Sequence, residues 1–237
     1  MNFGDVIGQA FRLIFSLDPD LLEIIGRSFQ VSLSSVVISA VVGAPLGAVI
    51  AMARFRGRGA LVVVLNALMG LPPVVVGLLV YVMLSRAGPL GVFNLLFSPT
   101  AMIIAQTVLI TPLIAALSRQ IVEDVWQGYA EQFRSWGIRP IRAVPTVLWD
   151  ARVGLMTVLL AGFGRAISEV GAVMIVGGNI DHLTRVMTTT IALETAKGDL
   201  DLAMALGLIL LLMSLLVNAL SHAVRRVAGP AASLARV

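Results

Sequence analysis

Five long apolar runs decide what this chain can fold into. Each approaches or exceeds the roughly 20 mostly apolar residues that a helix needs to cross a lipid bilayer. Charged residues make up only 13% of the chain, whereas soluble domains carry about 25%, so lipid must surround much of its surface. The runs cover residues 31–53, 60–85, 100–118, 153–178 and 202–223. We therefore predict an all-α, polytopic membrane helix bundle with five transmembrane helices.

The segment before the first run has a different pattern. Apolar residues from Phe3 to Phe15 recur at helical spacing, which predicts a short amphipathic helix. This helix either lies in the membrane interface or packs against the bundle. Asp18 and Pro19 predict the start of the next helix, with Asp18 as the N-cap. We predict a single domain over residues 1–237, with an N-terminal interfacial region at 1–27 and a five-helix core at 28–223.

Basic residues between the runs predict the orientation of the bundle. Eleven of them lie in segments on one side and five on the other. Lys and Arg are retained on the cytoplasmic side, so we predict a multi-pass protein of the cytoplasmic (inner) membrane with its N-terminus outside and its C-terminus inside. The inner set is Arg54, Arg56, Arg58, Arg119, Arg134, Arg139, Arg142, Arg152, Arg225, Arg226 and Arg236, and the outer set is Arg12, Arg27, Arg86, Arg185 and Lys197.

Residues 120–151 form a cytoplasmic segment that is too polar to span the membrane and too long for a tight turn. A helical piece running through Glu131 and Trp136 is predicted to end at Gly137, because glycine often terminates helices. Pro140 and Pro145 favour a second short helix set at an angle to the first. We predict a rigid helical elbow that a partner protein can grip and move.

This elbow resembles the EAA loop of ABC-importer permeases. Glu131 and Gly137 match that loop, and a Thr-Val-Leu run follows about ten residues later. Two departures stand out, since Gln132 and Phe133 replace the usual alanines and Leu148-Trp149 replaces the usual Leu-Pro. Residues 70–91 and 162–180 resemble the tungstate, molybdate and sulfate branch of these permeases. The run TTTIALETAKGDLDLAMALGL looks most like tungstate permeases.

The resemblance implies a type I ABC importer permease fold and a transport function. The chain would translocate a tetrahedral oxyanion, with tungstate favoured and molybdate or sulfate as alternatives. The implied partners are a second copy of the chain, two cytoplasmic ATPase subunits, an external oxyanion-binding protein and the lipid bilayer, without nucleic acid. ATP and Mg would bind the ATPase subunits, since this sequence has no Walker glycine loop. We therefore predict a subunit that is not itself an enzyme and has no cofactor of its own. The residues expected to couple to the ATPase are Glu131, Gln132, Phe133, Arg134, Ser135, Trp136 and Gly137.

A charged pair lies inside the fourth apolar run. Arg165 and Glu169 are one helical turn apart, so we predict an ion pair that fixes packing or gating, with substrate contact by Arg165 as the alternative. Pro72 and Pro73 predict a kink in the second run, with path lining as a second role. The residues predicted for the translocation path or gate are Arg165, Ser168, Glu169, Gly171, Gly177, Gly178, Asn179, Thr188, Thr189 and Thr190. Helix packing and capping are the alternative roles of these glycines and threonines.

Two other classes of function fit the sequence less well. An ATP-independent secondary transporter usually has inverted repeats and several ionisable groups within the membrane, whereas this sequence has one charged pair and no repeat. A membrane-embedded enzyme needs a nucleophile or metal constellation. His182 and His222 are forty residues apart without a nearby ligand pattern, so we predict no metal site.

Overall fold

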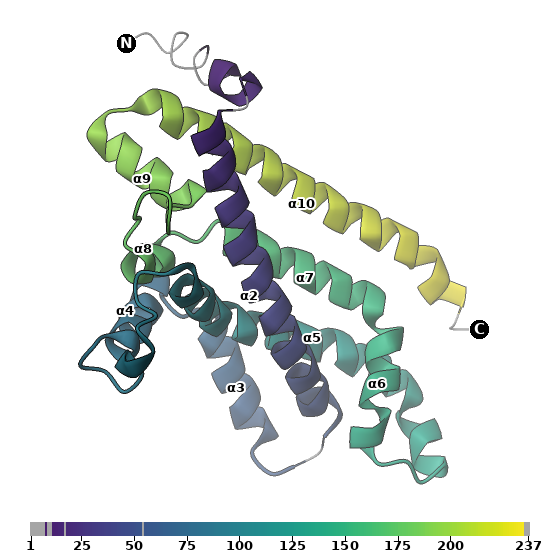
Figure 1. Cartoon of the computed structure of the whole chain (residues 1–237). Helices are drawn as coiled ribbons and strands as arrows, with labels where there is room; N and C mark the ends of the chain where they lie inside the picture. Colours follow the sequence, from purple (N-terminus) through teal and green to yellow (C-terminus); the bar gives the residue numbers. More distant parts are fainter. Residues whose placement is uncertain (1–7, 9–10, 17, 54, 235–237) are drawn as a thin grey trace. The chain divides into compact units, whose positions relative to one another are not determined.

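The computed structural model describes residues 8, 11–16, 18–53 and 55–234, with side chains described as far as Val224. These residues form helices joined by turns, and no strand occurs among them (Figure 1). The prediction of an all-α protein is therefore confirmed. The elements are α2 (Pro19–Met52), α3 (Arg58–Met69), α4 (Pro73–Leu84), the 3-10 helix η1 (Gly91–Phe93), α5 (Pro99–Ser135), α6 (Pro140–Asp150), α7 (Arg152–Ile167), α8 (Gly171–Gly177), α9 (Met187–Lys197) and α10 (Leu200–Leu234).

The chain divides into two compact units, each made of three separate segments. Unit 1 comprises Met1–Ser35, Pro72–Gln106 and Gly164–Leu216. Unit 2 comprises Val36–Leu71, Thr107–Phe163 and Val217–Val237. Helices α2, α5, α7 and α10 contribute residues to both units. The single domain expected over residues 1–237 stays a prediction.

Among the described residues, three helices are long and apolar enough to cross a membrane: α2, α5 and the first 25 residues of α10. Two further candidates are bent pairs, with α3 and α4 bent by 95° and α6 and α7 by 76°. Counting each pair as one span gives the predicted number of five. The predicted kink at Pro72 and Pro73 is confirmed, because α3 ends at Met69 and α4 begins at Pro73.

The fourth predicted span, residues 153–178, is wrong as a single helix. Helix α7 ends at Ile167 and α8 begins only at Gly171. A carboxylate oxygen of Glu169 accepts a hydrogen bond from the backbone N–H of Ala172 at 3.2 Å, so this side chain starts a new helix where the old one stops.

The helix that contains the third predicted span is longer than predicted, because α5 continues to Ser135. The first half of the predicted loop at 120–151 is therefore helix.

The predicted start of the first long helix is confirmed. Pro19 is the first residue of α2, and the Asp18 carboxylate accepts the backbone N–H groups of Asp20 and Leu21 at 3.0 and 3.1 Å. Of the predicted N-terminal helix, residues 11–15 are helical and their two phenylalanines, Phe11 and Phe15, stack with ring centres 6.4 Å apart. Phe3 and the other apolar residues before position 8 lie outside the described residues.

In unit 2, helices α2 and α5 approach closely through small residues. A Cβ on Gly43 would lie 3.0 Å from the carbonyl oxygen of Thr111, and one on Gly47 would overlap the carbonyl oxygen of Ala115. Beside this contact the Thr111 hydroxyl lies 3.2 Å from that of Ser39. Small residues that admit a close backbone approach, together with hydroxyl hydrogen bonds, are the usual means of helix association in lipid.

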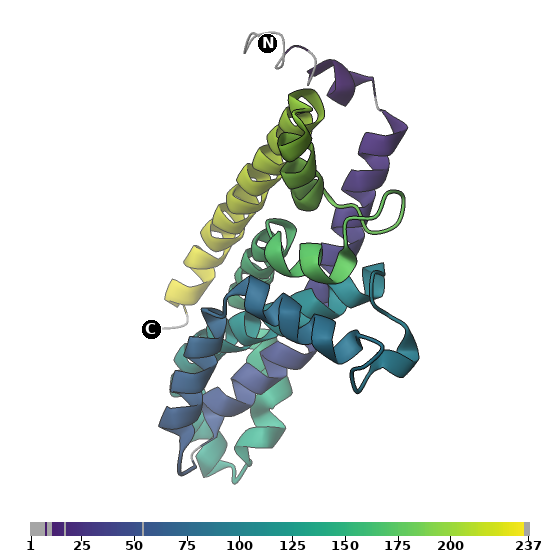
Figure 2. The ribbon, with the colours of Figure 1, turned by 90° about the vertical axis from the view of Figure 1, so that its left-hand side faces the viewer.

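In unit 1, the short helices α4 and α8 lie against each other (Figure 2). A Cβ on Gly77 of α4 would lie 2.8 Å from the Cα of Ala172 on α8. A Cβ on Gly171 would lie 2.9 Å from the Val74 side chain. The two breaks at Pro72–Pro73 and at Ser168–Val170 thus lead into two helices that pack as one pair.

Replacing Gly77 by alanine tests this packing. The added methyl group meets backbone on α8 rather than a movable side chain, so the free energy of unfolding should fall by about 1–3 kcal/mol. Gly26→Ala in α2 is the matched control, because nothing lies within 4 Å of the added atom. That change should be neutral or stabilising by up to about 1 kcal/mol. Thermal unfolding in detergent compares them, and equal stability of Gly77→Ala and wild type would contradict the packing.

Candidate functional site

The predicted elbow, in which a helix through Glu131 and Trp136 ends at Gly137 and a second short helix follows, is present in the structure. Helix α5 ends at Ser135, and Gly137 adopts the left-handed conformation with φ +70°. The N–H of Ile138 donates to the carbonyl of Phe133 at 2.9 Å, and the N–H of Gly137 donates to that of Arg134 at 3.0 Å. This pair of bonds is the Schellman motif, in which glycine has no Cβ penalty. The predicted helix end at Gly137 is confirmed.

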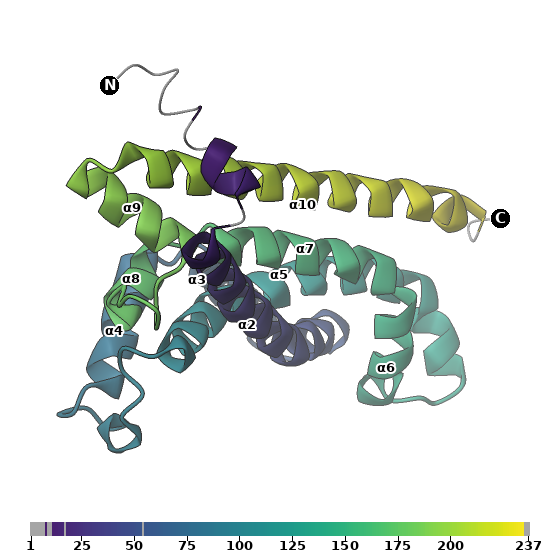
Figure 3. The same cartoon turned by 45° about the horizontal axis from the view of Figure 1, so that its top comes forward.

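Helix α6 then lies beside the last turns of α5 (Figures 1 and 3). Its start at Pro140 follows from the extended conformation of Arg139, which the next residue, a proline, favours. The buried side chains of α5 and α6 share one apolar cluster with the end of α2. Its buried members are Ala48, Ala51, Met52, Val122, Trp126, Phe133, Ala143, Val144, Val147 and Ala151.

The predicted ATPase-coupling residues divide into two kinds. Phe133 is buried, with its ring stacked on that of Trp126 at a centroid distance of 5.6 Å. Phe133 therefore holds the elbow together and does not offer a contact surface. The exposed members are Glu131, Gln132, Arg134, Ser135, Trp136 and Gly137, and the Trp136 side chain is 60% exposed. A large exposed indole on a packed body suits a protein contact.

An ionic cluster beside the elbow was missed by the sequence analysis. Arg58 lies 2.6 Å from one carboxylate oxygen of Glu123, and Arg119 contacts the other. Arg58 also donates to the carbonyls of Ile50 and Ala51 at 2.8 and 3.3 Å, near the C-terminus of α2. The spacing of Arg119 and Glu123 could have suggested their pair. The contact with Arg58, 65 positions away, could not be read from the sequence.

The predicted pair of Arg165 and Glu169 is present in unit 1. A guanidinium nitrogen lies 2.7 Å from a carboxylate oxygen. The Glu169 side chain is only 4% exposed while that of Arg165 is 43% exposed. The second Glu169 oxygen accepts from the Ala172 N–H, and the Glu169 carbonyl accepts from the Thr188 hydroxyl at 2.7 Å. The Glu169 carboxylate therefore links α7 to α8, and its backbone carbonyl links this break to α9.

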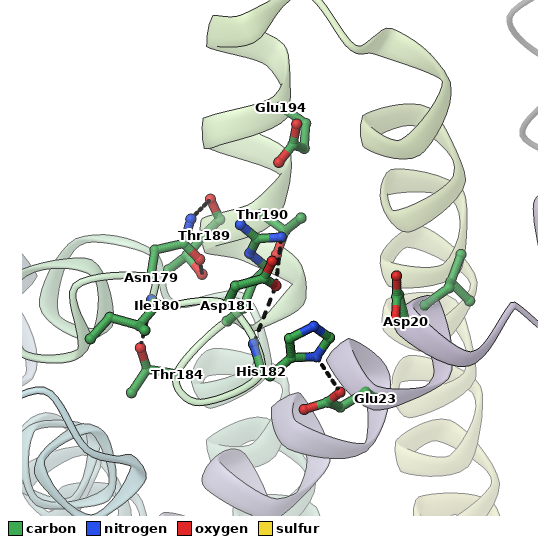
Figure 4. Close-up of polar contacts among 12 residues, drawn as sticks. Asp20, Glu23, Asn179, Ile180, Asp181, His182, Thr184, Thr189, Thr190 and Glu194 are labelled. Atoms are coloured by element: carbon green, nitrogen blue, oxygen red, sulfur yellow. Dashed lines mark hydrogen bonds and ion pairs between the residues drawn. The ribbon is translucent and has the colours of Figure 1, made fainter.

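The predicted path threonines form the start of α9. The side chains of Thr189 and Asn179 lie next to each other (Figure 4), and the Thr189 hydroxyl donates to the Asn179 side-chain oxygen at 2.8 Å. The Thr190 hydroxyl donates to the carbonyl of Val186 at 2.8 Å. With Thr188 bound to Glu169, each of the three buried hydroxyls has a partner within the protein. The structure brings Glu169, Asn179 and the threonines together, and it shows the capping and packing role that the sequence left open.

The remaining predicted path residues lie around the same breaks. The exposed Ser168 hydroxyl donates to the carbonyl of Gly164 at 2.9 Å. A Cβ on Gly177 would lie 2.9 Å from the Met102 sulfur, and one on Gly178 would lie 2.9 Å from the Phe97 ring. Gly178 also has φ +70° at the end of α8. These glycines serve close packing in unit 1. Their role in a path stays a prediction.

The chain's two histidines were not expected to bind metal. Among the described residues, no group of three or more His, Cys, Asp or Glu side chains is arranged to hold a metal ion.

The chain matches a known family of membrane transport proteins over most of its length. The family "Binding-protein-dependent transport system inner membrane component" matches residues 43–233. The chain belongs to this family. It is a permease of an ABC importer and a multi-pass protein of the inner membrane, as the resemblance at the elbow implied.

Individual relatives place it within the family. The chain is 43% identical over 205 residues to a probable anion ABC transporter permease of Haloferax volcanii, covering 84% of this chain and 88% of the relative. It is 40% identical over 225 residues to the tungstate uptake permease TupB of Peptoclostridium acidaminophilum, covering 93% and 99%. TupB of Campylobacter jejuni is 34% identical over 222 residues, covering 94% and 93%. The predicted resemblance to the tungstate, molybdate and sulfate branch is confirmed, with tungstate permeases among the most similar.

A solved structure supports the type I importer permease fold. The inward-facing MetNI methionine ABC transporter matches with a TM-score of 0.65 at 17% identity, covering 86% of this chain and 96% of that chain. At this identity the likeness concerns the fold alone.

A double-mutant cycle tests the Arg165–Glu169 pair. Arg165→Gln leaves a buried carboxylate without its cation, so the free energy of unfolding should fall by about 1–3 kcal/mol. Glu169→Gln retains an acceptor for the Ala172 N–H. The double variant should therefore lose less stability than the two single losses added together. Thermal unfolding in detergent measures this, and strictly additive losses would show that the two side chains do not interact.

Proposed function

We propose that this chain is the membrane-spanning subunit of a tungstate importer. It would translocate tungstate by alternating access, and separate ATPase subunits would drive this change of conformation. Two tungstate uptake permeases at 40% and 34% identity and a probable anion permease at 43% support this substrate. Molybdate and sulfate permeases are more distant, at 27% and 24%. Molybdate and sulfate are the alternatives, since all three are tetrahedral dianions.

The proposed partners follow from the family and the fold. They are a second copy of this chain, two cytoplasmic ATPase subunits that bind ATP and Mg, an external oxyanion-binding protein and the bilayer. The family is described as binding-protein-dependent, and the matching fold comes from an ABC transporter. In this assembly the chain would contribute the path and have neither an ATPase site nor a cofactor of its own. The N-terminus would face outside and the C-terminus inside.

The elbow is the observation that carries this proposal. Its exposed residues, among them Gln132 and Trp136, project from a body whose interior is shared by α2, α5 and α6. Well-packed interiors have low compressibility and transmit displacement. A push on the elbow by an ATPase subunit would therefore move the adjoining ends of α2 and α5 as one body.

The ionic cluster extends this body to a further span. Arg58 begins α3 and is held both to the end of α2 and to Glu123 of α5. The start of α3 would then follow the elbow. Because α3 leads to the break at Pro72 and Pro73, motion at the elbow would reach the bent second span.

The breaks in unit 1 suit passage of an anion without tight binding. We propose that Ser168, Gly171, Gly177, Gly178, Asn179 and the three threonines at the start of α9 border the path or its gate, with Pro72 and Pro73 as the kink. Arg165 is already paired with Glu169, so its attraction for a passing dianion is reduced. Transport requires contacts weak enough to permit release, which a paired arginine satisfies better than an isolated one.

Gly137→Asp tests the elbow as the ATPase contact. Aspartate tolerates the left-handed conformation better than most residues, so the fold should persist while a negative charge enters the contact surface. Co-purification of the ATPase subunit should fall about tenfold or more, since 1.4 kcal/mol of lost affinity is tenfold. Tungstate-stimulated ATP turnover with the binding protein should fall with it.

Gly128→Asp is the matched control, because it adds the same charge to an exposed position of α5, with nothing within 4 Å. Its ATPase subunit should co-purify as in wild type. Retention of the ATPase subunit by Gly137→Asp would overturn the assignment of the elbow. ATP turnover that is stimulated by molybdate or sulfate but not by tungstate would overturn the assignment of tungstate as the substrate. It would leave the assignment of the elbow unchanged.

A further inference from the structure

A polar cluster on the outer side of unit 1 has no part in the function described so far. It lies between α2 and the loop from Gly178 to Val186 that joins α8 to α9 (Figure 4). The tip of this loop, Asp181 and His182, is exposed. A small cavity beneath the tip is lined by Asp20, Glu23, Ile24, Asp181, His182, Leu183, Arg185 and Leu202.

The tip is attached to α2 by charged contacts. The Nδ1 atom of His182 lies 3.0 Å from a carboxylate oxygen of Glu23. Arg27 donates to the other Glu23 oxygen at 3.0 Å and to the backbone carbonyl of His182 at 3.1 Å. Within the loop, Arg185 lies 2.9 Å from Asp181. The loop tip is therefore held to α2 through one imidazole and one arginine.

The base of the loop is attached differently, by buried neutral groups. The Thr184 hydroxyl donates to the carbonyl of Gly177 at 2.6 Å and accepts the N–H of Ile180 at 2.8 Å. The N–H of Met187 donates to the Ser28 hydroxyl of α2 at 2.8 Å. These bonds do not change with pH in the physiological range, so only the tip can respond to protonation.

The charges around His182 favour its protonated form. Helix α2 contributes Asp20, Glu23 and Arg27, and the loop contributes Asp181 and Arg185. Three carboxylates thus face two guanidinium groups, and a protonated His182 makes the cluster neutral. Helix α10 contributes Leu202 to this cavity. Asp201 of α10 and Asp199, which precedes α10, line the adjoining cavity with Asp20, Asp18 and Arg12. Helix α9 bears the pair of Glu194 and Lys197 at 3.0 Å.

The hydrogen bond to Glu23, followed by the charges of Asp181, Glu23 and Asp20, raises the pKa of His182 above the 6.5 of an unperturbed imidazole. A raised pKa in the attached state means that a proton stabilises attachment. The stabilisation is complete below the pKa of the detached imidazole and is lost as pH rises through the higher pKa of the attached one. The neutral ring can keep one hydrogen bond to Glu23 but not the ion pair.

The backbone of the loop adds to this tendency to open. Asn179 and His182 both have positive φ, +49° and +54°, a conformation that costs free energy for residues other than glycine. The contacts of the tip must offset that cost. Asn179 is also the partner of Thr189 and follows Gly178 at the end of α8, so displacement of the tip acts directly on residues proposed for the gate.

We propose that His182 and Glu23 form a proton-dependent latch that holds the loop between α8 and α9 against α2 in acid and slows opening of the outer path. The latch rests on the proposed function for its effect on transport, but its opening can be measured by itself. It lies on the side of the membrane that we assign to the exterior, where an external substrate-binding protein would dock and where pH varies.

Spin labels measure the latch directly in the complete importer complex. The chain has no cysteine, so Leu22→Cys in α2 and Ile180→Cys in the loop, both exposed positions, introduce one label pair in each copy of the chain. Assembly with an excess of unlabelled chain and with cysteine-free partner subunits leaves one labelled copy in most labelled complexes. Raising the pH from about 5.5 to about 8 spans the titration of histidine, and the label-to-label distance should lengthen or broaden. With His182→Gln or Glu23→Gln added, the distances should be the same at both pH values.

Uptake into proteoliposomes at fixed internal pH measures the consequence. Initial tungstate uptake should be about two- to fivefold faster when the external pH is about 8 than when it is about 5.5. A change of this size is expected from the loss of one exposed ion pair. His182→Gln and Glu23→Gln should abolish this difference. His222→Gln, which changes the other histidine of the chain, should retain it.

The outcomes separate the two proposals. If the label-to-label distance is the same at both pH values in the chain that carries only the two cysteines, the latch is overturned. This holds whatever tungstate uptake is measured. An uptake response to pH that persists in His182→Gln also overturns it. A pH-dependent label distance without tungstate uptake at any pH supports the latch and contradicts the proposed substrate.

Discussion

The requirement that every backbone polar group in lipid find a partner governs this structure. A continuous helix meets it internally, and α2 and α5 do so over most of their length, apart from the turns that contain Pro45 and Pro112. Where the chain leaves the helix, polar groups must compensate. Glu169 does this at the start of α8 by accepting the Ala172 N–H, while its carbonyl accepts the Thr188 hydroxyl. The break before α8 is therefore compensated by Glu169 and Thr188, and most of the residues proposed for the path lie around it.

In unit 2 the same constraint on backbone polar groups is combined with a second one, that the elbow be joined rigidly to the neighbouring helices. We assign its elbow to the cytoplasmic side of the bilayer, where water can satisfy the end of a helix, and a Schellman motif at Gly137 ends α5. The buried rings of Trp126 and Phe133 and the shared apolar cluster join the elbow to the end of α2. Arg58 adds the start of α3. In the proposed assembly, this body would receive motion from an ATPase subunit at one surface and distribute it to several spans.

Much of this architecture could be predicted from local sequence signals. Asp18 before Pro19, the double proline at Pro72 and the glycine at 137 each act over a few residues, and each prediction was confirmed. The break after Ile167 could not be predicted in this way, because residues 153–178 are apolar enough for one span and the capping role of Glu169 depends on the fold. The burial of Phe133 and the contact of Arg58 with Glu123 depend on segments distant in sequence.

The most direct test of this account is to identify what touches the elbow in the assembled importer. A photo-cross-linking residue at Trp136, whose side chain is 60% exposed, should capture the ATP-binding subunit in native membranes. The same residue at Val92, 81% exposed in the loop assigned to the outer side, should not. Capture of the external binding protein from Trp136, or of the ATP-binding subunit from Val92, would contradict both the orientation of the chain and the role of the elbow.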